Sequence, residues 1–198
     1  MTTERSSLET QFSVIDENYA RITDKLAEAA IKSGRKPQDI TFMAVTKTVQ
    51  PALINHALSL GIDLIGENKV QELLSKLDFL EPADVNKHII GHLQSNKVRK
   101  IISTVSMIQS LDSISLADEI SLRASNAGVT MDVLLEVNIG SEISKTGFEL
   151  DSVLQSAAEI AEKDNIRIRG LMAVPPVCET ETEVRGYFEK NEPSVFRP

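Results

Sequence analysis

The sequence predicts an α/β fold built on parallel strands. Six short apolar or β-branched runs alternate with helix-like segments, with no low-complexity linker between them. Polar residues follow the runs, where a parallel strand leaves the core. A chain of 198 residues can bury one substantial core. We therefore expect a single domain over residues 1–198.

Periodicity alone does not separate an open doubly wound sheet from a closed barrel. No Gly-x-Gly-x-x-Gly follows the first apolar run, and the chain has no Walker phosphate loop. The absence of these motifs argues against the common nucleotide-binding folds. This favours a TIM-type (β/α) barrel.

The first half of the chain supplies three expected strands. A helix over 8–33 has apolar residues at intervals of three and four, and Gly34 ends it. The first strand covers 40–47, and its helix runs from Pro51 to Gly61. A second strand over 62–66 precedes a helix that starts at Val70 and stops at Pro82. The third strand, 88–91, leads into a helix that includes 98–102.

The second half supplies three more. A strand over 105–111 leads to a helix that ends at Gly128. The run 133–137 is the most strand-like in the chain, and it opens into a polar loop, 138–147. A helix over 150–161 precedes a sixth strand, 166–174, and a further helix covers 183–190.

Composition excludes several classes of protein. A net charge of −8 argues against a nucleic-acid surface, and the basic run 97–100 fits a solvated helix face better. The single cysteine, Cys178, excludes an internal disulfide and a cysteine-rich metal site. No apolar run is long enough to span a bilayer, so we expect a cytoplasmic protein without a membrane segment.

Lys47 is the first candidate functional residue, because we place it at the carboxyl end of the first strand, where α/β proteins bind ligands. A partly neutral lysine can condense with an aldehyde, and burial against apolar strand residues would favour that form. An ion pair with Glu67 is the structural alternative. Asn68 fits a helix cap as well as a ligand contact, while His88 and Met172 fit core positions.

Five motifs occur in order along the chain. They are Ala-Val-Thr-Lys-Thr at 44–48, Gly-Glu-Asn-x-Val-Gln-Glu at 66–72, His-x-Ile-Gly-x-Leu-Gln-x-Asn-Lys at 88–97, Ser-Lys-x-Gly at 144–147, and Gly-Leu-Met-Ala at 170–173. From about residue 8 to about residue 190 the chain resembles the pyridoxal phosphate homeostasis protein family, also called the YggS/PROSC family.

The resemblance implies a barrel of the alanine racemase N-terminal-domain type that holds pyridoxal 5'-phosphate (PLP) as an imine, or Schiff base, on Lys47. Asn68, His88 and Met172 are then cofactor-binding residues, and the loop residues Gln94, Asn96 and Lys97 support them. It further implies a PLP carrier without catalytic turnover, whose partners include PLP-dependent apo-enzymes.

The chain departs from the family after the helix at 183–190. The segments that supply the seventh and eighth strands and much of the phosphate cup are missing, and the tail 191–198 fits no family pattern. We therefore expect a truncated barrel with open strand edges and weaker PLP binding than in a full-length relative.

Three other functions stay open. A racemase or decarboxylase needs a second acid/base opposite the lysine, and the only tyrosines, Tyr19 and Tyr187, fall on expected helices. A lysine-imine aldolase would trap a sugar phosphate instead of PLP. A degenerate chain would bind no PLP, and the purified protein would show no visible chromophore. PLP could also attach to Lys97 or Lys145.

Overall fold

The computed structural model describes residues 2–140 and 146–190. They form two compact units. Unit 1 runs from the N-terminus to Glu67 and from Gln71 to Lys87, and unit 2 comprises residues 68–70 and the chain from His88 onward. The predicted tail at 191–198 and Lys145 lie outside the described residues. The single domain over 1–198 stays a prediction.

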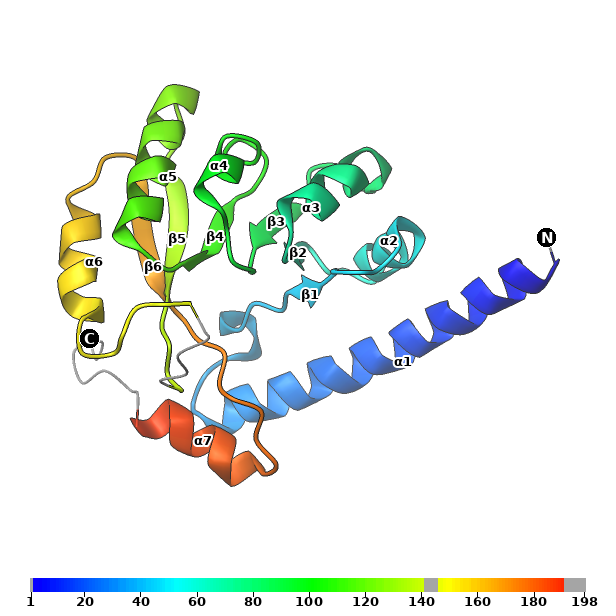
Figure 1. Ribbon diagram of the computed structural model, residues 1–198. Helices are drawn as coiled ribbons and strands as arrows, with labels where there is room; N and C mark the ends of the chain where they lie inside the picture. The colour runs from blue at the N-terminus through cyan, green and yellow to red at the C-terminus, as the bar shows by residue number, and fades with distance from the viewer. Residues whose placement is uncertain (1, 141–145, 191–198) are drawn as a thin grey trace. The chain divides into compact units, whose positions relative to one another are not determined.

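Six parallel strands follow one another in chain order within the described part of the sheet. They are β1 (Ala44–Val45), β2 (Leu64–Glu67), β3 (Asn86–Ile89), β4 (Met107–Leu111), β5 (Met131–Glu136) and β6 (Ile166–Met172). The helices are α1 (Thr2–Lys32), α2 (Pro51–Ser59), α3 (Val70–Lys76), α4 (Ser95–Val98), α5 (Ile114–Ala127), α6 (Val153–Ala161) and α7 (Glu181–Lys190), with short 3₁₀ turns η1 (Pro37–Asp39) and η2 (Leu77–Phe79). This alternation confirms the predicted α/β class (Figure 1).

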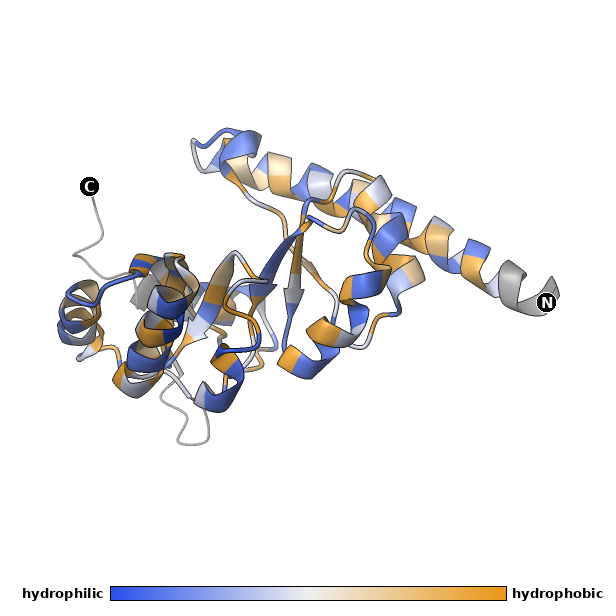
Figure 2. Cartoon of the chain, turned by 90° about the horizontal axis from the view of Figure 1, so that it is seen from above, coloured by the Kyte–Doolittle hydropathy of each residue, from blue (hydrophilic) through white to orange (hydrophobic). Residues whose placement is uncertain are grey.

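Unit 1 packs its helices on an aliphatic cluster. The buried members are Ile54, Leu58, Ile62, Ile65, Leu80 and Val85. The long helix α1 shows alternating hydrophobic and hydrophilic residues along its length, as its sequence period predicts (Figure 2). It ends at Lys32, and Gly34, with a φ of 74°, provides the left-handed exit from the helix.

The first strand is much shorter than the predicted run 40–47. Only Ala44 and Val45 pair with β2, opposite Ile65 and Gly66. The amide of Ile40 is already bonded to the carbonyl of Pro37, at 3.1 Å, as the cap of η1. Local capping therefore takes the backbone group that a longer strand would have used.

Strand β5 of unit 2 buries one of its two faces. On β5 the side chains of Met131, Val133 and Leu135 are buried, while those of the alternate residues are only half-buried. Helices α5 and α6 lie along the same side of β5 and β6 (Figure 1). The half-buried face, on which polar side chains gather, is the face that would line the interior of a barrel.

The helix predicted to carry residues 98–102 contains four residues, Ser95–Val98. Beyond it the chain continues in tight turns, with i to i+3 bonds such as Lys100 N–H to Lys97 C=O at 2.9 Å and Thr104 N–H to Ile101 C=O at 2.8 Å. Across residues 2–140 and 146–190, none of the helices has both the length and the apolar character needed to cross a bilayer.

We predict that Ile108→Ala destabilises the protein by about 2–5 kcal/mol, because the side chain is fully buried on β4 and its loss leaves a cavity. Urea unfolding measures the change. Leu122→Ala on α5 is the control: that side chain is 52% exposed, so its effect should stay within about 0.5 kcal/mol. Equal losses for the two variants would contradict the assignment of this core.

Candidate functional site

Lys47 lies in a four-residue turn directly after β1. The turn runs from Thr46 to Val49 and is closed by the Val49 amide, which donates to the Thr46 carbonyl at 3.0 Å. The lysine is exposed, so the expected burial against apolar strand residues is wrong. Its place after the strand agrees with the prediction, and its amine is accessible to a ligand.

The carboxylate of Glu67 pairs with Lys76, and not with Lys47 as the structural alternative expected. Lys76 Nζ donates to Glu67 Oε1 at 2.6 Å and to Glu72 Oε1 at 2.8 Å. Glu67 is fully buried at the end of β2. Burial lowers the pKa of Lys76, but its hydrogen bonds to the two carboxylates and their negative charges outweigh that effect, so the pKa is raised overall.

The same three side chains hold the turn that carries Lys47. Lys76 Nζ also donates to the Thr46 carbonyl at 2.8 Å, and the Thr46 hydroxyl donates to Glu67 Oε1 at 2.8 Å. On the other side of Lys47, the backbone amide of Thr48 donates to Glu72 Oε1. Both neighbours of the lysine are thus tied to one ionic group, which is formed by Glu67, Lys76 and Glu72.

Asn68 follows the last residue of β2 and is half-buried. Its backbone lies against Gly91, where an added Cβ atom would stand 2.6 Å from the Asn68 carbonyl oxygen and 2.9 Å from its Cα atom. Gly91 is therefore required for space, since any side chain there would push Asn68 away.

His88 lies in β3 with a half-buried side chain. Gln109 Nε2 on β4 is 2.8 Å from His88 Nδ1. Burial lowers the pKa of His88, and the negative charge of Asp132 offsets part of the shift. His88 is consequently neutral at pH 7, with Nδ1 accepting from the Gln109 amide.

Met172 ends β6 beside Glu136, its partner across the ladder, and the Val137 amide donates to its carbonyl at 2.8 Å. Burial raises the pKa of Glu136, and the charge of Asp112 raises it further. The charge of His92 and a hydrogen bond from Thr146 lower it in part. Oxygen Oε2 of Glu136 has no hydrogen-bond partner within the described residues.

Sequence reasoning missed both Lys76 and Glu136. The period-2 pattern of β5 could have placed Glu136 on the less buried face, at the end where ligands bind. Nothing local marks Lys76, because an i, i+4 Glu72–Lys76 pair also occurs on solvated helix faces.

The loop residues with an expected supporting role lie around α4. Gln94 and Asn96 are exposed and Lys97 is half-buried. The described parts of the chain contain no group of three or more His, Cys, Asp or Glu side chains that could hold a metal ion.

The family model "Alanine racemase, N-terminal domain" matches residues 16–193. The pyridoxal phosphate homeostasis protein of Aquifex aeolicus is 37% identical over 174 residues, which cover 88% of this chain and 76% of that relative.

Two solved structures are similar along most of the chain. A protein of unknown function from Bifidobacterium adolescentis has a TM-score of 0.85 and 34% identity over 92% of this chain and 79% of its own. PipY of Synechococcus elongatus, solved with PLP bound, has a TM-score of 0.69 and 29% identity, and the match covers 84% of this chain and 78% of PipY. The chain thus belongs to the alanine racemase N-terminal domain family and, within it, to the pyridoxal phosphate homeostasis proteins, which confirms the predicted fold type.

Proposed function

We propose that this chain binds PLP and serves PLP homeostasis, with Lys47 as the residue that attaches the cofactor. The observation that carries the proposal is an exposed primary amine on the turn that follows the first parallel strand. The relative PipY, whose structure holds PLP, supports the cofactor assignment.

The residues present fit such a ligand in their chemistry. PLP supplies an aldehyde, with which an accessible lysine amine forms a reversible covalent bond. In unit 2, the neutral imidazole of His88 and the thioether of Met172 are half-buried groups suited to a flat aromatic ring. Asn68, held in place by Gly91, adds an amide that can donate or accept.

We propose a carrier and not an enzyme. Proton abstraction at an amino acid α-carbon needs a second acid/base opposite the lysine, commonly a tyrosine or cysteine. Tyr19 lies on α1 with its ring 5.8 Å from that of Phe42, and Tyr187 lies on α7. The thiol of Cys178 donates to the Pro176 carbonyl at 3.2 Å. These contacts give Tyr19 and Cys178 structural roles.

The alternative is a racemase or decarboxylase-like enzyme, which membership of the alanine racemase N-terminal domain family favours. Deuterium exchange at the α-carbon of amino acids distinguishes the two. If the protein is a carrier, α-carbon deuterium exchange should be no faster with it than with its Lys47→Ala variant.

PLP-dependent apo-enzymes are the proposed recipients, and the cytoplasm is the proposed location. The net charge of −8 speaks against nucleic acid as a partner.

Lys47→Ala is expected to abolish the visible absorbance of bound PLP, because no amine is left after β1 to attack the aldehyde. Borohydride reduction followed by peptide mapping measures the covalent adduct. In the natural sequence the adduct should map to the peptide that contains Lys47.

Lys36→Ala is the matched control, since Lys36 is another exposed lysine of unit 1. It should leave the absorbance and the mapped adduct unchanged. An adduct that survives Lys47→Ala on Lys97 or Lys145, or a reduced sugar phosphate in place of PLP, would refute the assignment.

A second prediction concerns Glu136, which lies beside the proposed ligand residue Met172. The folded pKa of Glu136 is raised above the ordinary value of 4.5, so its stabilising contribution is complete below pH 4.5 and is lost as pH rises through the folded pKa. Glu136→Gln removes the ionisable group, and with it this loss of stability as the pH rises. Its melting temperature should exceed that of the natural sequence near neutral pH, and the difference should shrink below pH 4.5.

Thermal unfolding between about pH 4 and about pH 8 measures this difference. Glu159→Gln on α6 is the control, because it makes the same replacement at an exposed carboxylate. A gain from Glu136→Gln that is the same at both ends of the range would show that Glu136 is not kept neutral by burial.

A further inference from the structure

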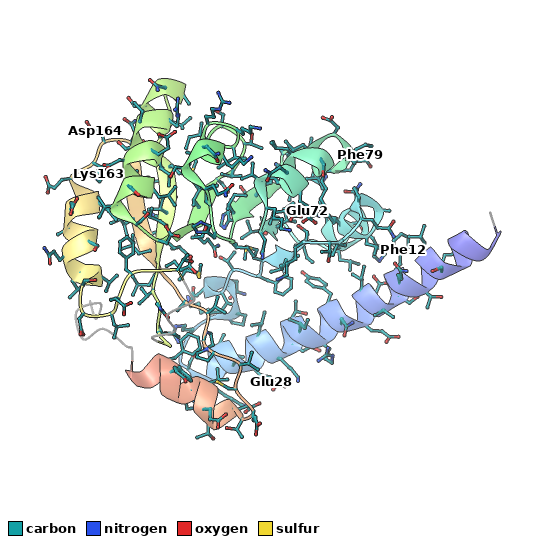
Figure 3. The ribbon with its side chains drawn as sticks, viewed as in Figure 1. Phe12, Glu28, Glu72, Phe79, Lys163 and Asp164 are labelled. Carbon is teal, nitrogen blue, oxygen red and sulfur yellow. The ribbon has the colours of Figure 1, made fainter. Side chains whose placement is uncertain are left out.

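The turn that carries Lys47 is fastened to α3 on both sides of the lysine. Before it, Lys76 Nζ binds the Thr46 carbonyl at 2.8 Å, and after it, the Thr48 amide donates to Glu72 Oε1. Glu72 and Lys76 are one helical turn apart on α3, where Glu72 is labelled in Figure 3. One helix face therefore fixes the backbone on both sides of a single exposed residue.

Thr48 has a strained backbone. Its φ of 63° lies in the left-handed region, which β-branched residues rarely adopt. Strain of this kind persists only where the surroundings hold the residue, and it is concentrated at functional sites. Here the hydrogen bond from the Thr48 amide to Glu72 is the restraint that holds it.

Stability alone does not explain the ionic group. Two carboxylates share one ammonium, Glu67 is fully buried, and its Oε2 atom has no hydrogen-bond partner among the described residues. Desolvating such a group costs free energy that apolar residues of similar volume would not. The arrangement instead delivers hydrogen bonds to the two residues that flank Lys47.

We infer that Glu67, Lys76 and Glu72 are positioning residues, which hold the turn Thr46–Val49 so that the Lys47 amine points in the direction that PLP attachment needs. This inference rests on the proposed role of Lys47. The three residues act through the backbone of Thr46 and Thr48.

The test uses Glu72, the partly exposed member, because its replacement does not leave a fully buried charge. Glu72→Ala should slow the attachment of PLP to Lys47 by about tenfold to a hundredfold, since a small misplacement of a reacting group has effects of that size. The rate is followed by absorbance and by borohydride trapping. Glu28→Ala, an exposed carboxylate on α1, is the control and should leave the rate unchanged (Figure 3).

Two rescue variants separate positioning from general damage. Glu72→Gln keeps an acceptor for the Thr48 amide and should retain most of the rate. Adding Thr48→Gly to Glu72→Ala should restore part of the rate, because glycine adopts a positive φ without strain. If neither variant recovers any of the lost rate, the inference is wrong.

The Lys47→Ala background separates an effect on the lysine from general damage. In that background, adding Glu72→Ala should leave non-covalent PLP affinity unchanged. A loss of this affinity would show a general structural role and overturn the inference, as would a Glu72→Ala variant that attaches PLP as fast as the natural sequence.

Amide hydrogen exchange gives a readout that needs no PLP. The Thr48 amide should be protected in the natural sequence and exposed in Glu72→Ala. Unchanged exchange overturns the inference about the turn. A natural sequence that attaches no PLP to Lys47 but shows the expected exchange would refute the proposed function and leave the restraint of the turn established.

Discussion

The Lys76 ammonium is the interaction on which the arrangement around Lys47 depends. It joins the turn after β1, the end of β2 and helix α3 through three acceptors within 2.8 Å. Without it, Glu67 would be a buried and unpaired charge, a defect that destabilises proteins by about 3–5 kcal/mol. The chain can therefore form this strand end only with the turn in place, so folding and placement of the lysine are coupled.

Two polar groups on the strands of unit 2 have pKa values shifted by burial. Burial lowers the pKa of His88 and raises that of Glu136, so both groups are driven toward their neutral forms. At the end of β2, by contrast, Glu67 and Lys76 are buried as an ion pair.

The sequence predicted the order of elements well, because hydrophobic period and helix punctuation are local signals. Gly34 and Gly128 mark helix ends with positive φ, as their positions suggested. Strand lengths were less predictable. The length of β1 depends on which of its backbone groups bond to η1 and which pair with β2. The sequence also did not reveal the partner of Glu67, because only the three-dimensional fold shows that Lys76, and not Lys47, reaches its carboxylate.

The exposure of Lys47 bears directly on the choice between carrier and enzyme. A buried lysine with a companion acid/base holds its cofactor through many turnovers, whereas an amine open to solvent lets water or another protein's lysine reach the covalent bond. The proposed attachment at Lys47 would combine a backbone fixed on both sides of the lysine with an amine open to solvent. Rapid capture together with easy release is what delivery of a reactive aldehyde requires, and it is the combination that a racemase would have to avoid.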